Sequence, residues 1–370
     1  MSFVIQSRRT SRAVPPDLSF GQLMLDVAGT TLTDADRKLL ADPNVGGVIL
    51  FARNVETPAQ VRALTDSIRA IKPNILLAVD QEGGRVARLR QGFTPLPAMG
   101  RLGAYFTQSP VEALSLAYAC GYVMAAEVLA VGIDFSFAPV LDIDGISQVI
   151  GDRAFHSTPV VVTALSAQFM HGMHAAGMAT TGKHFPGHGS VAPDSHVAQA
   201  VDARTFDEIV VQDMLPFIQN LPQLDALMPA HVIFSHVDDK PAGFSAVWLQ
   251  DIIRKRLNFD GVLFSDDLSM QAAHVAGDAA ARLAAALGAG CDMGVICNDR
   301  AAAMLALDSL RQQNLDQPHK LLSPASQQRL CRMVGAIPAW QGDLQSTAGQ
   351  LPQWQDLQAR VADFCAHLAH

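Results

Sequence analysis

Short runs of apolar and β-branched residues alternate along most of the chain with longer segments whose apolar positions have helical spacing. Apolar runs of this length are typical of strands buried on both faces of a parallel sheet, and helical segments between them supply the crossover connections. We predict strands at residues 23–27, 47–51, 75–80, 135–140, 178–184, 226–230, 262–265 and 293–297. Eight such strand–helix units predict an α/β fold of the (β/α)8 TIM-barrel type rather than an open doubly wound sheet.

Start and stop signals place several helices between these strands. The helix at 33–40 opens with Thr-x-x-Asp, and the helix at 57–71 has Pro58 in its first turn, where proline is tolerated. Asp278 heads an alanine-rich helix that we expect to end at Gly288.

The strand–helix alternation ends near residue 298, and this point divides the predicted organisation of the chain. We predict an N-terminal arm at 1–17, one catalytic barrel at 18–298, and a C-terminal helical extension at 299–370 packed on the barrel. Within the extension we expect a helix at 301–312, a polar linker near 313–324 and two more helical pieces. Its Gln, Pro and Ser content is typical of a peripheral extension, not of a second catalytic domain.

Composition and charge narrow the class of protein. A hydrophobic share of 49% with 17% charged residues is typical of a compact globular chain, and the net charge of −8 argues against a nucleic-acid partner. Charged residues interrupt the most apolar segments, so we predict no membrane span. The pair Arg8-Arg9 is not followed by the apolar stretch of an export signal, and the five cysteines are scattered without a C-x-x-C pair. We therefore expect a cytoplasmic protein without disulfides.

Polar side chains follow five of the predicted strands, and in this fold the carboxyl ends of the strands form one rim that carries the active site. They are Asp80-Gln81-Glu82-Gly83-Gly84-Arg85 after the third strand, Asp142, Asp144 and Gly151-Asp152-Arg153 after the fourth, Lys183-His184 after the fifth, His231 after the sixth, and Ser265-Asp266-Asp267 after the seventh. The sequence lacks the glycine-rich nucleotide motifs and the G-x-S-x-G element of serine hydrolases. Carboxylates, arginines and histidines on one rim suit a carbohydrate, because they donate to and accept from several hydroxyls at once.

Three strings of residues resemble the family 3 glycoside hydrolases: Asp80-Gln81-Glu82-Gly83-Gly84-Arg85-Val86, Lys183-His184-Phe185-Pro186-Gly187-His188-Gly189 followed by Asp194-Ser195-His196, and Phe264-Ser265-Asp266-Asp267-Leu268-Ser269-Met270. The resemblance covers about residues 18–298 and is strongest to the single-domain bacterial β-N-acetylglucosaminidases of peptidoglycan recycling. It implies that Asp266 is the nucleophile, His196 the general acid/base and Asp194 its partner. It further implies sugar contacts by Asp80, Arg88, Arg153, Lys183 and His184.

The chemistry of the residues agrees with these implied roles. Retaining cleavage needs a carboxylate that attacks the anomeric carbon and a group that first donates and later accepts a proton. A histidine can do both near neutral pH, and a carboxylate beside it fixes its tautomer and favours its protonated form. Asp266 and Asp267 point to different sides of the strand end, and the resemblance, not the pattern, selects Asp266. Ala154 and Pro193 depart from the usual family pattern, and Pro193 is expected to stiffen the loop before Asp194.

The sequence therefore predicts a retaining exo-β-N-acetylglucosaminidase that acts on 1,6-anhydro-muropeptides without metal or cofactor, with a small carbohydrate as its partner and a monomer favoured. Three alternatives stay open. One is a metal-dependent barrel hydrolase that uses His184, His188, Asp194, His196 and His231 as ligands. The others are a β-glycosidase of different sugar specificity and a carbohydrate-binding barrel without activity. The sequence does not assign roles to His188, His231 and Asp267, nor does it separate hydrolysis from phosphorolysis.

Overall fold

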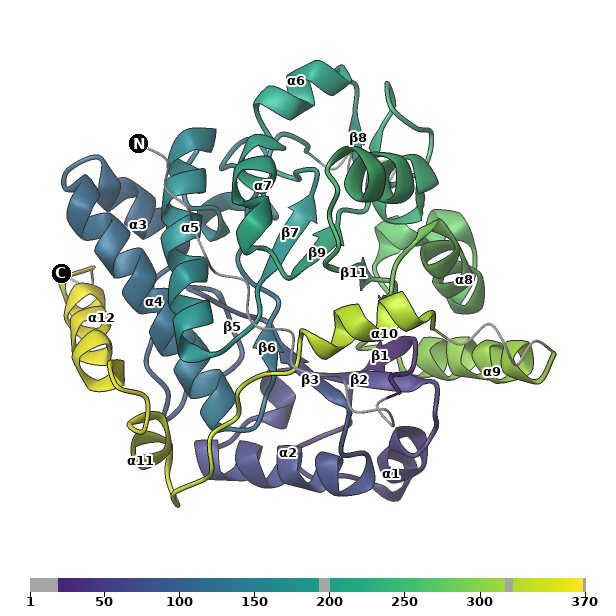
Figure 1. Ribbon diagram of the computed structural model, residues 1–370, viewed down its shortest axis with the longest axis horizontal. Coiled ribbons are helices and arrows are strands. Elements are labelled where there is room, and N and C mark those ends of the chain that lie inside the picture. Colours follow the sequence, from purple (N-terminus) through teal and green to yellow (C-terminus); the bar gives the residue numbers. More distant parts are fainter. Residues whose placement is uncertain (1–18, 193–199, 317–321, 369–370) are drawn as a thin grey trace.

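Eight parallel strands form the central sheet of the computed structural model, which describes residues 19–192, 200–316 and 322–368 (Figure 1). Their spatial order is β6-β3-β2-β1-β12-β11-β9-β7, and an isolated parallel bridge between Val140 and Lys183 joins the two ends of this order. The (β/α)8 prediction is confirmed. The strands are β1 (Leu23–Leu25), β2 (Val45–Leu50), β3 (Leu76–Val79), β6 (Phe135–Ser136), β7 (Thr181–Phe185), β9 (Ala226–Pro229), β11 (Val262–Asp267) and β12 (Met293–Val295).

All eight predicted strands are present, and their ends differ from the prediction by a few residues. Two small additional sheets were not predicted. In one, β4 (Gln81–Gly83) pairs antiparallel with β5 (Val86–Ala87), and in the other β8 (Ala200–Asp202) pairs parallel with β10 (Val232–Phe234). These strands are too short to show an apolar run, and their pairing depends on the fold around them.

Helices surround the sheet, as Figure 1 shows. The ring contains α1 (Asp34–Leu40), α2 (Pro58–Ile71), α3 (Met99–Phe106), α4 (Pro110–Ala130), α5 (Pro159–Ala176), α6 (Phe206–Val211), α7 (Leu215–Asn220), a π-helix (Val247–Arg256) and α8 (Ala279–Ala289). The predicted start signals are confirmed, because the side chains of Thr33 and Asp278 each accept a backbone N–H in the first turn and Pro58 is the first residue of α2.

The predicted end of α8 at Gly288 is wrong. The helix continues through Gly288 to Ala289, and Gly290 follows it with φ +129°. A Cβ at Gly290 would lie 1.8 Å from Nε2 of Gln250, whereas a Cβ at Gly288 would meet nothing within 4 Å. The residue that needs both the unusual backbone conformation and the missing side chain is therefore Gly290.

Helix α4 is the one helix of the described chain that is long and apolar enough to cross a membrane. However, 83% of its most apolar window is buried inside the structure, where it packs against α5, α12 and α3. It also carries the buried carboxyl group of Glu127. This environment explains its apolar composition as that of a core helix.

The C-terminal part of the chain contains α9 (Arg300–Asp316), α10 (Pro324–Cys331), α11 (Leu344–Ala348) and α12 (Trp354–Leu368). The prediction was wrong in two details, because α9 extends into the expected linker and three helices, not two, follow it. The boundaries at 17 and 298 stay predictions, and the arm at 1–17 lies outside the described residues.

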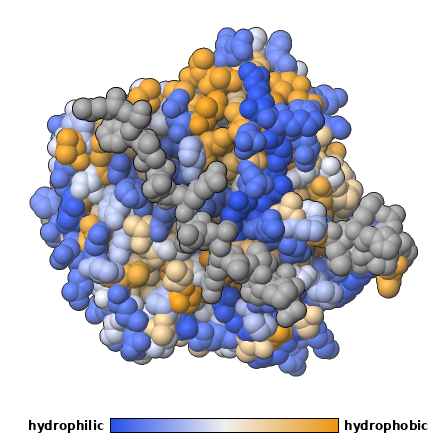
Figure 2. Space-filling model, viewed as in Figure 1, coloured by the Kyte–Doolittle hydropathy of each residue, from blue (hydrophilic) through white to orange (hydrophobic). Residues whose placement is uncertain are grey.

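The face of the molecule that is turned toward the viewer in Figure 1 is mainly hydrophilic in the space-filling view. It has an apolar area in the region of α6, whose Val211 is exposed (Figure 2).

Segment 322–340 covers the end of the barrel where the strands begin. Arg329 forms ion pairs of 2.9 Å with Asp260 and with Asp292, which lie just before β11 and β12. The backbone N–H of Gly335 donates to Asp134, the residue before β6, at 3.1 Å. Because this end is covered, the opposite end, where the strands finish, is available for a site.

Candidate active site

A cavity of about 510 Å³ lies at the carboxyl ends of the strands, within the usual size range of small-molecule sites. Six of the eight predicted site residues line it: Asp80, Arg88, Arg153, Lys183, His184 and Asp266. Asp80 and Arg88 lie in the segment after β3, and Arg153 lies in the short helical turn Gly151–Arg153. Lys183 and His184 lie at the end of β7, and Asp266 lies at the end of β11. Asp194 and His196 lie outside the described residues, so their predicted placement beside Asp266 stays a prediction.

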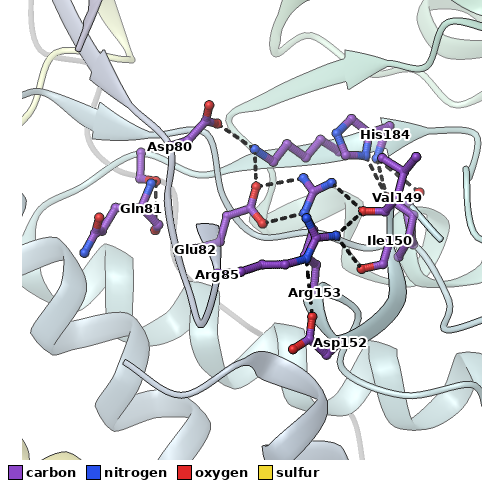
Figure 3. A network of polar contacts seen from close by, with 12 residues as sticks. Asp80, Gln81, Glu82, Arg85, Val149, Ile150, Asp152, Arg153 and His184 are labelled. Atoms are coloured by element: carbon purple, nitrogen blue, oxygen red, sulfur yellow. Dashed lines mark hydrogen bonds and ion pairs between the residues drawn. The ribbon is translucent and has the colours of Figure 1, made fainter. Parts of the chain in front are cut away.

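Glu82 organises the cationic side of the cavity, although the sequence did not assign it a role. Its carboxylate lies 2.6 Å from Nζ of Lys183 and accepts two hydrogen bonds of 2.9 Å from Arg153 (Figure 3). Lys183 also donates to Asp80 at 2.8 Å, and Arg88 approaches the other oxygen of Asp80 at 3.6 Å. Two carboxylates thus hold three cationic side chains at fixed positions around the cavity.

This network determines the charge state of its members. Burial alone would raise the pKa of Glu82, but the charges of Lys183 and Arg153 and their hydrogen bonds lower it to about 2. Burial would lower the pKa of Lys183, yet Asp80 and Glu82 hold it above its usual value. Lys183 is therefore a cation and Glu82 an anion at neutral pH. The N–H groups of Lys183 and Arg153 that these contacts do not use can donate to a ligand in the cavity.

His184 is oriented by Asp142, another residue that was not assigned a role from the sequence. Nδ1 of His184 lies 2.7 Å from Oδ2 of Asp142, which is fully buried. His184 lines the cavity, and its other ring nitrogen, Nε2, has no hydrogen-bond partner among the described residues. Burial would raise the pKa of Asp142, but His184 lowers it. The same carboxylate accepts the backbone N–H of His188 at 2.7 Å. One buried carboxylate therefore fixes both the tautomer of His184 and the start of the following loop.

Asp266 and its neighbour Asp267 have different surroundings, which separates two residues that the strand pattern did not distinguish. Burial would raise the pKa of Asp266, but His184 and His231 lower it, so the group is ionised at neutral pH. Asp267 accepts hydrogen bonds from the backbone N–H and the hydroxyl of Ser269, at 2.9 and 2.7 Å, and burial raises its pKa. The Asp267 carboxylate closes a turn, whereas the one hydrogen bond that the Asp266 carboxylate accepts from the described residues comes from the N–H of Asp267.

His188 and His231 also line the cavity, and both are held by neighbouring groups. Nδ1 of His188 lies 3.2 Å from the hydroxyl of Ser147, and burial lowers the pKa of the His188 ring. Nε2 of His231 lies 3.1 Å from the backbone oxygen of Asp267, and its ring stacks on Phe244 with centroids 5.5 Å apart. These contacts support the loop after β7 and the end of β11.

The described residues do not contain a group of three or more His, Cys, Asp or Glu side chains arranged to hold a metal ion. The rings of His184 and His188 lie 6.2 Å apart in an edge-on arrangement, and Asp142 and Ser147 occupy one nitrogen of each. Two members of the metal alternative, Asp194 and His196, lie outside the described part, so this geometry concerns only the remaining histidines.

Glu82 and Asp142 are the residues that sequence reasoning missed. A signal for Glu82 was present, because Asp80 and Glu82 are two positions apart at a strand end and such residues point to the same side. For Asp142 the sequence offered only its position after the fourth strand. Its partner His184 is 42 positions away, so the pairing follows from barrel closure.

A barrel with carboxylates, cations and histidines at the carboxyl ends of its strands suits a carbohydrate-cleaving enzyme, and the match to a family of glycosyl hydrolases shows that the protein is of this class. The chain belongs to glycosyl hydrolase family 3, since the model of that family's N-terminal domain matches residues 17–332. The β-hexosaminidase of Pseudomonas aeruginosa strain PAO1 is 59% identical over 302 residues, which cover 81% of this chain and 90% of that protein. The β-hexosaminidase of Hydrogenovibrio crunogenus is 47% identical over 94% of this chain and 95% of its own length.

The solved structures agree with these relatives. NagZ from Neisseria gonorrhoeae in complex with N-trifluoroacetyl-D-glucosamine is 38% identical, with a TM-score of 0.83 over 95% of this chain and 99% of that one. The same Neisseria protein has also been solved with a zinc ion, at a TM-score of 0.82. The chain is thus an enzyme, a β-N-acetylhexosaminidase of family 3.

Proposed function

We propose that the chain is a retaining exo-β-N-acetylglucosaminidase that removes the terminal β-1,4-linked N-acetylglucosamine of 1,6-anhydro-muropeptides during peptidoglycan recycling in the cytoplasm. The observation that carries the proposal is the ionised carboxylate of Asp266 in a cavity with Asp80, Arg153, Lys183 and His184. The relative solved with N-trifluoroacetyl-D-glucosamine, an N-acylated glucosamine, supports the choice of sugar.

The proposed reaction has two steps. The carboxylate of Asp266 attacks the anomeric carbon, and the aglycone oxygen takes a proton from His196 as the glycosidic bond breaks. In the second step His196 accepts a proton from water, which attacks the glycosyl-enzyme and releases the sugar with its original β configuration. We assign Asp194 the task of favouring the protonated form of His196 before the first step.

The remaining residues act by position and charge. We propose that Asp80 accepts hydrogen bonds from the sugar hydroxyls while Lys183, Arg153, Arg88 and His184 donate to them. Because Glu82 already fixes Lys183 and Arg153 in free enzyme, these donors lose little freedom when substrate binds. We propose that the enzyme acts as a monomer on a soluble carbohydrate, without metal, nucleic acid or membrane.

Intact-protein mass spectrometry after incubation with a 2-acetamido fluorosugar tests the class, the mechanism and the nucleophile together. We expect one added glycosyl group on the peptide that contains Asp266. A label on another residue, or no label in a preparation that cleaves an aryl N-acetylglucosaminide, contradicts the proposed mechanism. Full activity after dialysis against a chelator excludes the metal-dependent alternative, and a comparison of aryl N-acetylglucosaminide with aryl glucoside tests the sugar.

A further inference from the structure

We propose that Arg85, at the mouth of the cavity, binds a carboxylate of the aglycone, the part of the substrate that leaves after cleavage. This inference rests on the proposed function, because it names the group of the muropeptide that is recognised beside the sugar. Arg85 lies in the turn between β4 and β5, lines the cavity and has an exposed side chain.

Two guanidinium groups meet at one carbonyl oxygen on this wall of the cavity. Arg85 donates to the backbone oxygen of Val149 at 2.5 Å, and Arg153 donates to the same oxygen at 3.2 Å. Figure 3 shows the two guanidinium groups beside each other, with Glu82 on the side of Arg153. Two cations this close repel each other unless anions compensate both of them.

Only one of these two cations is well compensated. Arg153 forms a bidentate pair with the buried Glu82. The one ion pair of Arg85 within the described residues is with Asp152 at 3.6 Å, where the two side chains are 52% and 58% exposed. A pair that is this long and this exposed contributes little. Arg85 therefore keeps most of its positive charge available to a ligand.

Arg85 also has unused donors. Its Nη2 atom donates to the backbone oxygens of Val149 and Ile150, whereas Nη1 has no hydrogen-bond partner in the part of the chain that the structure describes. The backbone contacts hold the guanidinium group in place, so little side-chain freedom remains to be lost on binding. A planar guanidinium group held in this way suits a carboxylate, whose two oxygens match its parallel N–H groups.

The rest of the segment strengthens the positive potential at the mouth. Arg88 has Asp80 as its acidic neighbour, but Asp80 is already paired with Lys183 at the shorter distance of 2.8 Å. The buried Nε atom of Arg88 has no hydrogen-bond partner among the described residues. Arg90 reaches back to the carbonyl oxygens of Ala87 and Arg85 without an ion pair in the described regions. Three arginines lie within six residues, and Arg85 and Arg88 line the cavity while Arg90 contacts the backbone of Arg85. They favour an anion here, although the whole chain has a net charge of −8.

The interior and the mouth of the cavity differ in the group they select. Inside, the carboxylates of Asp80, Glu82 and Asp266 balance the charges of Lys183, Arg153 and Arg88, and such a balanced set suits the hydroxyls of a neutral sugar. At the mouth, the excess of arginines suits a negatively charged group. A muropeptide aglycone offers a carboxylate on its lactyl group or on its peptide. Arg85 would bind either carboxylate by the same ion pair and hydrogen bonds.

Kinetics with matched disaccharides test the inference and separate the two sources. The substrates are N-acetylglucosaminyl-β-1,4-anhydro-N-acetylmuramic acid, its neutral lactyl methylamide, and the disaccharide with an alanyl-glutamyl dipeptide on the lactyl group. We expect Arg85→Gln to raise KM about fivefold for the substrate whose carboxylate it binds. Both kcat and the KM of the methylamide should stay unchanged, and Arg85→Lys should retain part of the effect. Arg37→Gln, an exposed arginine on α1, is the matched control.

Each outcome has a clear meaning. If Arg85→Gln raises KM equally for the charged and neutral substrates, Arg85 only supports the loop at 146–150 and the inference is wrong. The inference is equally wrong if none of the KM values changes. If the unmodified enzyme cleaves an aryl N-acetylglucosaminide but none of the disaccharides, the proposed substrate is wrong and the inference fails with it. A KM change confined to the dipeptide substrate identifies the peptide as the source of the carboxylate.

Discussion

Oε1 of Glu82 lies 2.6 Å from Nζ of Lys183, and both side chains are almost fully buried in the wall of the cavity. The same carboxylate holds Arg153. Two residues with proposed roles in sugar binding therefore depend on a third that has no proposed contact with the sugar. This relationship makes Glu82 a positioning residue.

Glu82→Gln should lower both activity and stability. The variant leaves the buried Lys183 with Asp80 alone of its two ion-pair partners in the described residues and removes the bidentate partner of Arg153, so we expect a loss of about 3 kcal/mol in unfolding free energy at pH 7. The pKa of Glu82 in the folded state is about 2, below its ordinary value of 4.5, so its contribution is complete above pH 4.5 and disappears as the pH falls toward 2. Chemical unfolding at pH 7 and pH 3 measures this difference.

The control for Glu82 is Glu56→Gln, which removes an exposed carboxylate outside the cavity. It should change neither KM nor the unfolding free energy. If Glu82→Gln lost the same free energy at pH 3 as at pH 7, the network of ion pairs would not be the cause of the loss.

The neighbouring residues Asp266 and Asp267 should respond differently to the same substitution. Asp266→Asn removes the proposed nucleophile and should reduce kcat by at least about 1,000-fold. Asp267→Asn removes an acceptor from the turn at Ser269, so it should cost about 1 to 2 kcal/mol of stability but retain covalent labelling by the fluorosugar. If the two variants are folded to the same extent and lose labelling equally, the assignment of Asp266 rather than Asp267 as the nucleophile is wrong.

Most of the barrel could be predicted because buried strands carry a local signal. Val45, Val48 and Leu50 of β2 are fully buried, as are Leu76, Leu77 and Val79 of β3, and such apolar runs stand out between polar turns. The β4–β5 hairpin carries no such signal, since it contains Gln81, Glu82 and Arg85. Its shape depends on Gly83 and Gly84, both at positive φ, and on contacts with residues 96–98.

The site was predicted as a set of residues on one rim, and the structure adds the contacts that fix them. The strand order makes neighbours of β7 and the segment after β6, which brings Asp142 to His184. Arg153 reaches Glu82 across 71 positions of sequence. Such pairings follow from closure of the barrel and not from any local pattern, so spacing alone did not provide them.

Glu127→Gln should remove a loss of stability that the wild type suffers as the pH rises through neutrality, although it also replaces one of the two oxygens that accept from Thr94. Glu127 is buried on α4 and accepts a hydrogen bond of 2.5 Å from the hydroxyl of Thr94, and burial raises its pKa to about 7. Because this value exceeds the ordinary 4.5, the wild type loses stability between pH 4.5 and 7, on the order of 3 kcal/mol. Glutamine stays neutral throughout this range.

Thermal unfolding at pH 5 and pH 8 checks this prediction. The quantity to compare is the Tm of Glu127→Gln minus the Tm of the wild type. We expect this difference to be several degrees higher at pH 8 than at pH 5. Glu56→Gln serves again as the exposed control, and its Tm should follow that of the wild type at both pH values. Parallel curves for Glu127→Gln and the wild type would show that Glu127 titrates in the folded protein as an exposed glutamate does.

Leaving-group dependence provides the sharpest test of the role proposed for His196. A general acid matters most when the leaving oxygen is a strong base, because that oxygen needs a proton before it departs. His196→Ala should therefore lose about 100-fold or more in kcat/KM for a disaccharide and far less for an aryl glycoside with an acidic phenol. Asp194→Asn should show the same pattern with smaller losses, because it acts through His196. His236→Ala removes an exposed histidine that does not line the cavity and should leave both substrates unaffected. Equal losses for both substrates in His196→Ala would assign the proton transfer to another group, and the histidines already in the cavity, His184, His188 and His231, would be the next to test.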